Sequence, residues 1–295
     1  MALYAFDGTG NTDHEDDLRD SNVLTFFQAY DDPRKNANPD DDLGSLYLKG
    51  IGRAAKTKVG MGVAEAFGIG GHRRVEQAMA RLKRNRRNGD STVDVVGFSR
   101  GAALAISFAN DVADELPDQR IRFVGVFDLV GQFGLPGTHV NAGHQLSLPD
   151  NVECCRHAMA MDESRALFPL TRLCDDDGVA AKSLVELWFR GVHSDVGGGN
   201  RNRGLNWIAL HWMFQHAVRC GLPVASTAIA ANLAHKALPQ MISDHKLDFE
   251  KERKFLATDC LHSSVQLVDG APGRPHNNPK IALRRFDDDG NLVAA

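Results

Sequence analysis

One strand–turn–helix segment constrains the fold of this chain more than any other feature. The apolar, β-branched run VDVVGF at 93–98 leads through Ser99 into a stretch of small residues at 101–106. The first run is typical of a buried strand, and the small residues suit a helix packed closely on a sheet. Gly97 and Gly101 flank the serine and leave space for a sharp turn. The segment predicts a nucleophilic serine at a strand-to-helix turn; a serine that only caps the helix is the alternative.

A serine hydroxyl needs a base, usually a histidine oriented by a carboxylate, and two later strands offer both groups. Asp128 directly follows the apolar run 123–127, and His193 follows the run 184–189 and precedes a run of three glycines. Buried parallel strands present catalytic groups at their carboxyl ends. The order serine, acid, histidine is also that of α/β hydrolases. We therefore expect Ser99, Asp128 and His193 to form a catalytic triad.

The identity of the base has a second candidate. The chain contains 12 histidines, and His262, in the sequence LHSS, lies later in the chain, where many α/β hydrolases place their base. His193 is favoured because it stands at a predicted strand end before a glycine-rich loop. His262 stays open as the alternative base.

Hydrolysis by a serine also needs two N–H donors for the oxyanion that develops on the substrate carbonyl. The residue after the nucleophile, Arg100, is expected to supply one backbone amide. The second is expected from the turn after the first predicted strand, DGTGN at 7–11, with Gly8 or Thr9 as the donor. This turn lacks the Lys-Ser/Thr ending of a phosphate-binding loop and the alternating oxygen ligands of a calcium-binding loop.

Two further aspartates stand near these predicted loops. We expect Asp7 and Asp195 to form hydrogen bonds that hold the loops carrying Ser99 and His193. A divalent-ion site formed by the two carboxylates is the alternative. The predicted reaction requires no cofactor and no metal.

The first part of the chain supplies further predicted elements. Apolar runs at 3–6 and 46–48 predict strands, and Ser21 is expected to cap a short helix. The glycine-rich stretch 60–71 predicts a flexible segment that leads into an amphipathic helix. That helix ends on the basic run at 83–87, which complements the helix dipole and needs no ligand.

The second part of the chain shows fewer regular patterns. Residues 131–180 are expected to be irregular and rich in loops, residues 207–218 to form a helix, and the chain to end in a hairpin around 287–290. The alternation of strands and helices predicts an α/β fold, an α/β-hydrolase-like, doubly wound, mostly parallel sheet flanked by helices. We expect residues 1–295 to form a single domain.

Composition excludes several classes of function. The 295 residues carry a formal net charge of -4, which disfavours nucleic acid as a partner. Five cysteines without metal-ligand spacing predict reduced thiols and a cytoplasmic place in the producing cell. The start, MALYAFD, lacks the features of a signal peptide, and no apolar run is long enough to span a bilayer. Any membrane contact is therefore expected to be peripheral.

Several segments together resemble the DUF2235 family of α/β hydrolases, which includes the Tle1 phospholipase effectors of type VI secretion. The matching segments are FDGTGN at 6–11, SNV at 21–23, GFSRGA at 97–102, FDLVG at 127–131 and WFRGVHSDVGGG at 188–199. Leu129 and Asn200 depart from the family pattern, and neither carries a predicted catalytic atom. The combination is far more specific than any one of its motifs.

The resemblance implies cleavage of carboxylic esters by the triad Ser99, Asp128 and His193, with a glycerophospholipid as the leading substrate in an A1 or A2 type of reaction. It also implies delivery by a type VI secretion system, a secretion-system component as partner and an immunity protein as antagonist. Two alternatives stay open at this point. One is a soluble carboxylesterase or thioesterase, and the other is a non-catalytic binding module that retains the hydrolase fold.

Overall fold

The structure is a computed structural model. It describes residues 1–9, 11, 20–32, 34, 43–51, 61–131, 146–174, 178, 180–200, 204–236, 241–243, 251–267 and 277–293, with the backbone alone at 61–69.

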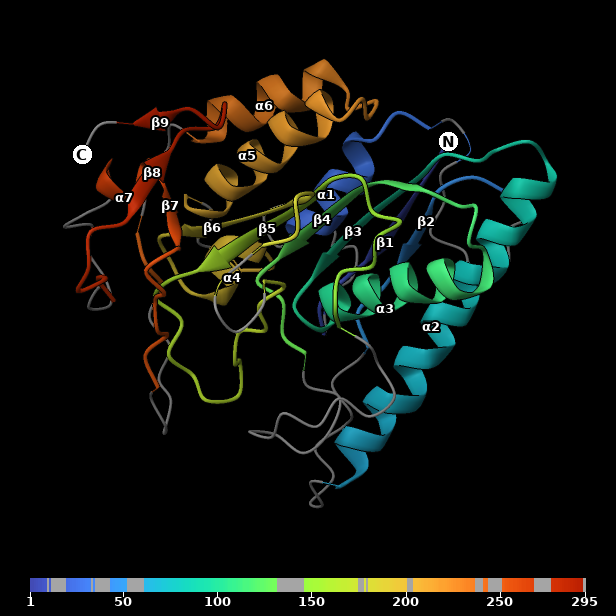
Figure 1. The fold of residues 1–295 in the computed structure, drawn as a ribbon, viewed down its shortest axis with the longest axis horizontal. Helices are drawn as coiled ribbons and strands as arrows, with labels where there is room; N and C mark the ends of the chain where they lie inside the picture. Colours follow the sequence, from blue (N-terminus) through green and yellow to red (C-terminus); the bar gives the residue numbers. More distant parts are fainter. Residues whose placement is uncertain are drawn as a thin grey trace.

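A single sheet organises the described part of the chain (Figure 1). Its strand order is β2-β1-β3-β4-β5-β6-β7-β8-β9, and among the described strands only β9 runs antiparallel to its neighbour. The bounds are Ala2–Phe6 (β1), Leu46–Leu48 (β2), Val93–Phe98 (β3), Ile121–Phe127 (β4), Cys155–Ala160 (β5), Leu184–Phe189 (β6), Cys260–His262 (β7), Arg284–Phe286 (β8) and Leu292–Val293 (β9).

Helices cover both faces of this sheet, with α2 and α3 on one face and α1 and α5 on the other (Figure 1). Their bounds are Asn22–Ala29 (α1), Met61–Arg87 (α2), Arg100–Glu115 (α3), His193–Gly197 (α4), Asn206–Arg219 (α5), Ser226–Lys236 (α6) and Ser264–Leu267 (α7). Alternate residues of β1 enter the two apolar cores: Leu3 packs with α1 and α5, whereas Tyr4 packs with α2 and α3. The central strands are mostly apolar because both faces of the sheet are covered.

The strand order places a topological switch point beside Ser99. The chain passes from β1 to β2 on one side and then crosses to β3 on the other, so β1 lies between β2 and β3. Connections leave the carboxyl ends of β1 and β3 toward opposite faces of the sheet, and ligands bind at such switch points in folds of this kind. The turn after β1 and the Ser99 turn after β3 pack against each other there. The predicted doubly wound, mostly parallel fold is confirmed.

Several predicted elements are confirmed, and the prediction for residues 131–180 was wrong. The strands at 3–6, 46–48 and 184–189 form, and α1 begins after Ser21, whose Oγ accepts a hydrogen bond from the Leu24 amide at 3.1 Å. The region 131–180 is not irregular throughout, because β5 lies within it, paired between β4 and β6. Residues 132–145, 175–177 and 179 of that region lie outside the described residues.

β5 begins with the polar sequence CRH, so it does not stand out in the sequence as an apolar run. In the fold these side chains are buried with partners: His157 Nδ1 lies 2.8 Å from Glu186 Oε1, and His157 Nε2 accepts from the Leu129 amide at 3.2 Å. A buried polar group is tolerated where it is hydrogen-bonded. Those partners come from other strands, so the pattern of β5 alone did not identify it.

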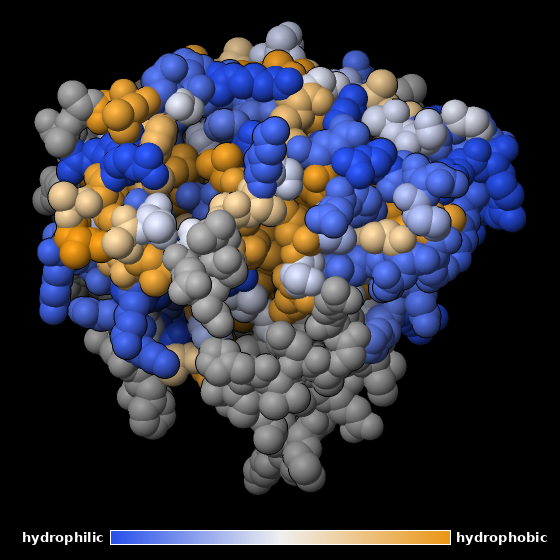
Figure 2. All heavy atoms as spheres, viewed as in Figure 1, coloured by the Kyte–Doolittle hydropathy of each residue, from blue (hydrophilic) through white to orange (hydrophobic). Residues whose placement is uncertain are grey.

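The glycine-rich segment also differs from expectation. It was predicted to be flexible, but α2 begins at Met61 and runs through the glycines to the basic run at its end. Figure 2 shows hydrophilic side chains over the part of the surface where this helix lies.

The hairpin at the end of the chain is confirmed, with β8 and β9 joined by a turn in which the Gly290 amide donates to the Asp287 carbonyl. None of the described helices is both long and apolar enough to cross a bilayer.

Candidate active site

Ser99 occupies a strained backbone conformation between β3 and α3. Its φ of 58° and ψ of -127° lie outside the regions that residues with a side chain normally adopt. Such strain costs of order 1–3 kcal/mol and persists only where the surroundings impose it. Here the Ser99 amide donates to the Phe127 carbonyl at 3.0 Å, which ties the turn to the end of β4.

The two glycines of the motif are required by close packing at this turn. A Cβ on Gly97 would lie 2.6 Å from Ala102 Cα, and a Cβ on Gly101 would lie 2.2 Å from the Phe6 carbonyl oxygen. Both contacts are far shorter than carbon and oxygen atoms allow. The turn therefore forms only because neither residue has a side chain.

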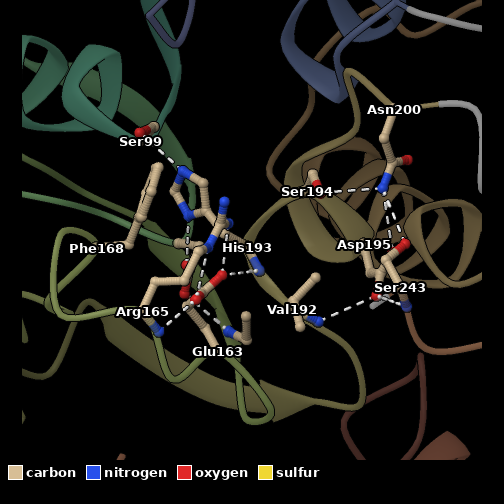
Figure 3. Close-up of polar contacts among 12 residues, drawn as sticks. Ser99, Glu163, Arg165, Phe168, Val192, His193, Ser194, Asp195, Asn200 and Ser243 are labelled. Atoms are coloured by element: carbon tan, nitrogen blue, oxygen red, sulfur yellow. Dashed lines mark hydrogen bonds and ion pairs between the residues drawn. The ribbon is translucent and has the colours of Figure 1, made fainter. Parts of the chain in front are cut away.

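The structure brings the three predicted triad residues into one hydrogen-bonded chain. His193 Nε2 lies 2.8 Å from Ser99 Oγ, and His193 Nδ1 lies 2.6 Å from Asp128 Oδ2. Figure 3 shows the His193 ring directed at Ser99. Asp128 follows β4 with a φ of 41°, so both residues with a side chain and a positive φ in the described chain belong to this group. This arrangement is the one that activates a serine hydroxyl.

Two aromatic rings and one carboxylate hold His193 in place. The Phe98 and Phe168 rings lie 4.6 and 4.8 Å from the imidazole. Glu163 accepts a hydrogen bond from the His193 backbone amide at 3.1 Å, and Arg165 pairs with Glu163 (Figure 3). Burial lowers the pKa of His193 below its usual value near 6.5, although the Asp128 carboxylate opposes this shift. The imidazole is thereby kept neutral and able to accept a proton.

Asp128 is fully buried, yet its carboxylate is satisfied by four hydrogen bonds, two of which come from a charged guanidinium. Besides His193, its carboxylate receives the Ala160 amide at 2.8 Å and the guanidinium of Arg253 at 2.5 and 2.9 Å. Burial alone would raise the pKa of Asp128, but Arg253 and His193 together hold it well below its usual value. These partners favour the ionised form of the Asp128 carboxylate.

The turn after β1 is organised around Asp7. Its carboxylate accepts from Ser21 Oγ and Tyr47 Oη, both at 2.6 Å, and from the Gly8 amide at 2.6 Å. Asp7 was predicted to hold the loops that carry Ser99 and His193, whereas these contacts hold its own turn and join it to Ser21 and to Tyr47 of β2. The Gly8 amide is already used by Asp7, so of the two donors predicted for this turn, Gly8 and Thr9, the Thr9 amide is the better candidate. Gly8 packs on the Phe98 ring, beside the Ser99 turn.

Asp195 plays a similar part in the segment that follows His193. It accepts from the Val192 amide at 3.1 Å and from the Ser243 hydroxyl at 2.5 Å, and Asn200 Nδ2 donates to both Asp195 and Ser194 (Figure 3). These bonds tie the loop around residue 243 to the glycine-rich segment after His193. Within the ranges that the structure describes, no group of three or more His, Cys, Asp or Glu side chains could hold a metal ion.

The alternative base, His262, lies away from the serine. Its Nδ1 is 2.7 Å from Ser264 Oγ, its Nε2 is 3.2 Å from Asp288 Oδ1, and its ring stacks on Phe189. These contacts anchor the β7–β8 region to the rest of the sheet.

A cavity of about 380 Å³ lies next to the triad, with Phe168 and Arg253 in the wall between them. Its other lining residues include Glu163, Arg165, Arg172, Trp188, Lys251, Lys254 and Leu256.

Sequence reasoning missed Glu163, Phe168 and Arg253. The first two follow β5, whose strand signal was hidden by its polar start. Arg253 is one of many arginines in the chain, and nothing in its local sequence indicates that it contacts Asp128. A search for polar residues after β5 could have found Glu163, but only the fold reveals Arg253.

Comparison with known proteins now identifies the family. A family model described as "T6SS, Phospholipase effector Tle1-like, catalytic domain" matches two overlapping segments, 3–114 and 107–216, which together span most of the chain. The chain belongs to the Tle1-like family. The predicted resemblance to Tle1-type effectors is therefore confirmed. The match includes all three triad residues and ends before Arg253. No curated protein matches the chain significantly.

Solved structures are similar in fold. An uncharacterised protein from Pseudomonas aeruginosa has a TM-score of 0.57 at 22% identity, over 80% of this chain and 48% of that one. The Tle1 effector bound to the VgrG spike of the type 6 secretion system has a TM-score of 0.46 at 23% identity, over 67% of this chain and 50% of that one. The Tle1-like chain thus spans about half the length of both proteins.

Proposed function

We propose that this Tle1-like chain is a serine hydrolase that cleaves an acyl ester of glycerophospholipids. Ser99 is the nucleophile, His193 the general base and Asp128 the acid that orients it. The observation that carries the proposal is the 2.8 Å contact between Ser99 Oγ and His193 Nε2 at a strained turn. Membership of a phospholipase effector family supports the choice of phospholipid as substrate.

The proposed reaction proceeds in two halves. Ser99 Oγ attacks the acyl carbonyl, its proton passes to His193 Nε2, and the carbonyl electron pair moves to oxygen. The backbone amides of Arg100 and Thr9 are the proposed donors to this oxyanion. Collapse of the intermediate expels the lysophospholipid oxygen, which takes the proton from His193. Water then attacks the acyl-enzyme by the same route and releases a fatty acid.

Labelling with a fluorophosphonate tests the nucleophile. The native protein is expected to react covalently, Ser99→Ala to lose the label and Ser107→Ala to keep it. Ser107 is a suitable control because it is also buried and lies on α3, directly after the turn. Failure of the native protein to react would contradict the triad and favour a non-catalytic module.

Hydrolysis of two substrate classes tests the substrate. Vesicles of phosphatidylethanolamine and phosphatidylglycerol are expected to release fatty acid with the native protein and not with Ser99→Ala. Short-chain soluble esters serve as the comparison. Activity on the soluble esters alone would contradict phospholipid cleavage and favour a soluble esterase or thioesterase. The position of the released acyl chain distinguishes the A1 from the A2 reaction.

We further propose that a type VI secretion system delivers the protein, that a component of that system is its partner, and that an immunity protein antagonises it. The family description names this secretion system, and the solved Tle1 effector is bound to a VgrG spike. Expression directed to the periplasm is expected to arrest growth with native Ser99 and not with Ser99→Ala. Growth arrest by both forms would contradict an effector role based on hydrolysis.

A further inference from the structure

The Asp128 carboxylate is shared between two partners, the imidazole of His193 and the guanidinium of Arg253. His193 approaches Asp128 Oδ2 at 2.6 Å, and Arg253 forms a two-pronged pair, with Nη1 at 2.5 Å from Oδ1 and Nη2 at 2.9 Å from Oδ2. Bidentate arginine–carboxylate pairs are strong and directional, and they fix the plane of the carboxylate. The orientation of Asp128 toward the imidazole is thereby determined by Arg253 as much as by the backbone.

Arg253 is itself firmly held. Its guanidinium also donates to the carbonyls of Ala160 and Phe168, at 2.5 and 3.1 Å, and its own carbonyl accepts from Asn277 at 3.0 Å. The Arg253 side chain is only 7% exposed. A flexible surface arginine would not adopt a single arrangement with this many partners. These contacts place the guanidinium where it meets both carboxylate oxygens.

The charge on Arg253 affects the imidazole through Asp128. The charged groups that face His193 within the described chain are Asp128 after β4, and Glu163 and Arg165 after β5. An unopposed carboxylate beside the ring would favour the protonated imidazole, which cannot act as a base. Arg253 offsets that carboxylate and leaves its oxygens in place to accept the Nδ1 proton.

We propose that Arg253 is a positioning residue for the reaction at Ser99: its guanidinium orients the Asp128 carboxylate and offsets its charge, so that His193 remains a neutral base. This inference rests on the proposed function of the triad. Arg253 touches neither the serine nor the substrate carbonyl, and acts only through Asp128. It lies outside the residues that the family model matches, on a segment that the fold brings to the triad from the last fifth of the chain.

The pH dependence of kcat/KM tests the proposal with Arg253→Met. We expect the acid limb to move upward by about one pH unit, because removal of a neighbouring cation stabilises the protonated imidazole by that order. Arg172→Met is the matched control. Arg172 lines the same cavity and pairs with the buried Asp259 and Glu186, but it does not contact Asp128. Its acid limb is expected to coincide with that of the native protein.

An unchanged acid limb in a folded Arg253→Met protein would overturn the proposal. If that variant does not fold, Arg253→Lys carries the test, since lysine keeps the charge but loses the two-pronged geometry. We then expect kcat to fall by about tenfold with an unchanged KM and acid limb, because orientation alone is impaired. Native kcat in Arg253→Lys would overturn the positioning role.

Chemical rescue gives a second readout. Truncation in Arg253→Ala extends the neighbouring cavity of about 380 Å³ to the Asp128 carboxylate. Millimolar methylguanidinium is expected to restore activity to this variant and to have no effect on a matched Arg172→Ala variant. Absence of rescue in folded Arg253→Ala would count against the proposal.

Two measurements separate this inference from the proposed function. Loss of hydrolysis in Ser99→Ala together with a native acid limb in Arg253→Met would refute the role of Arg253 and leave the proposed triad standing. Full activity in Ser99→Ala would refute the triad. Histidine NMR titration needs no activity: the His193 resonance, assigned with His193→Gln, is expected to titrate at a higher pH in Arg253→Met than in the native protein.

Discussion

Replacement of Gly101 by alanine is the sharpest test of how the Ser99 turn is built. The new Cβ would lie 2.2 Å from the Phe6 carbonyl oxygen and 2.5 Å from the Asp7 carbonyl oxygen, which are both backbone atoms. Neither can rotate away. The start of α3 must therefore separate from the end of β1, the two elements that carry Ser99 and the turn with the Thr9 amide.

The size of the effect follows from the overlap. Carbon–oxygen contacts normally begin near 3.3 Å, so relief of the clash requires a displacement of about 1 Å. A displacement of about 1 Å at a catalytic site costs roughly 100-fold in rate. Overpacking of this kind also destabilises a fold by about 1–3 kcal/mol. We expect Gly101→Ala to remain folded at room temperature and to lose activity out of proportion to its lost stability.

Gly89→Ala is the matched control. Gly89 has a φ of +84°, so alanine there strains the backbone, but a Cβ at this position meets nothing within 4 Å. Its stability is expected to fall by about 1 kcal/mol with full activity. The assays are the rate of fluorophosphonate labelling, kcat/KM for a short-chain ester and thermal unfolding. A kcat/KM of Gly101→Ala within about twofold of native would refute the reasoning, because the clash would then have been absorbed away from the site.

Three further predictions concern the identity of the base, its titration and the turn after β1. His193→Ala is expected to lower kcat by about 1,000-fold or more, whereas His262→Ala should lower the melting temperature and keep most of the activity; the reverse result would make His262 the base. The acid limb of kcat/KM for the native protein should lie below pH 6.5, because burial lowers the pKa of His193 and activity is lost only as the pH falls through that value; a midpoint above pH 6.5 would contradict this. Tyr47→Phe removes one donor to Asp7 and should lower kcat by about tenfold with little change in KM, as the turn with the Thr9 amide loosens; an unchanged kcat would exclude this turn from oxyanion binding.

The sequence by itself determined the parts of this protein that depend on local rules. The β-branched runs and the small residues after Ser99 specify a strand, a turn and a helix, and the glycines beside Ser99 specify how tight that turn is. The positions of Ser99, Asp128 and His193 at the ends of β3, β4 and β6 followed from the same local patterns. Parallel strands bring their carboxyl ends to one edge of a sheet, so local patterns also predicted which side chains would meet there.

Only the tertiary structure decided the contacts between distant segments. β5 is a central strand because Glu186 and the Leu129 amide satisfy its buried His157, and neither partner is near it in sequence. His193 rather than His262 reaches Ser99 because His193 follows β6, while His262 lies on β7, one strand farther from β3 in the sheet. Arg253 meets Asp128 across 125 residues. Pairings of this kind depend on the packing of whole elements, and no local pattern of residues encodes them.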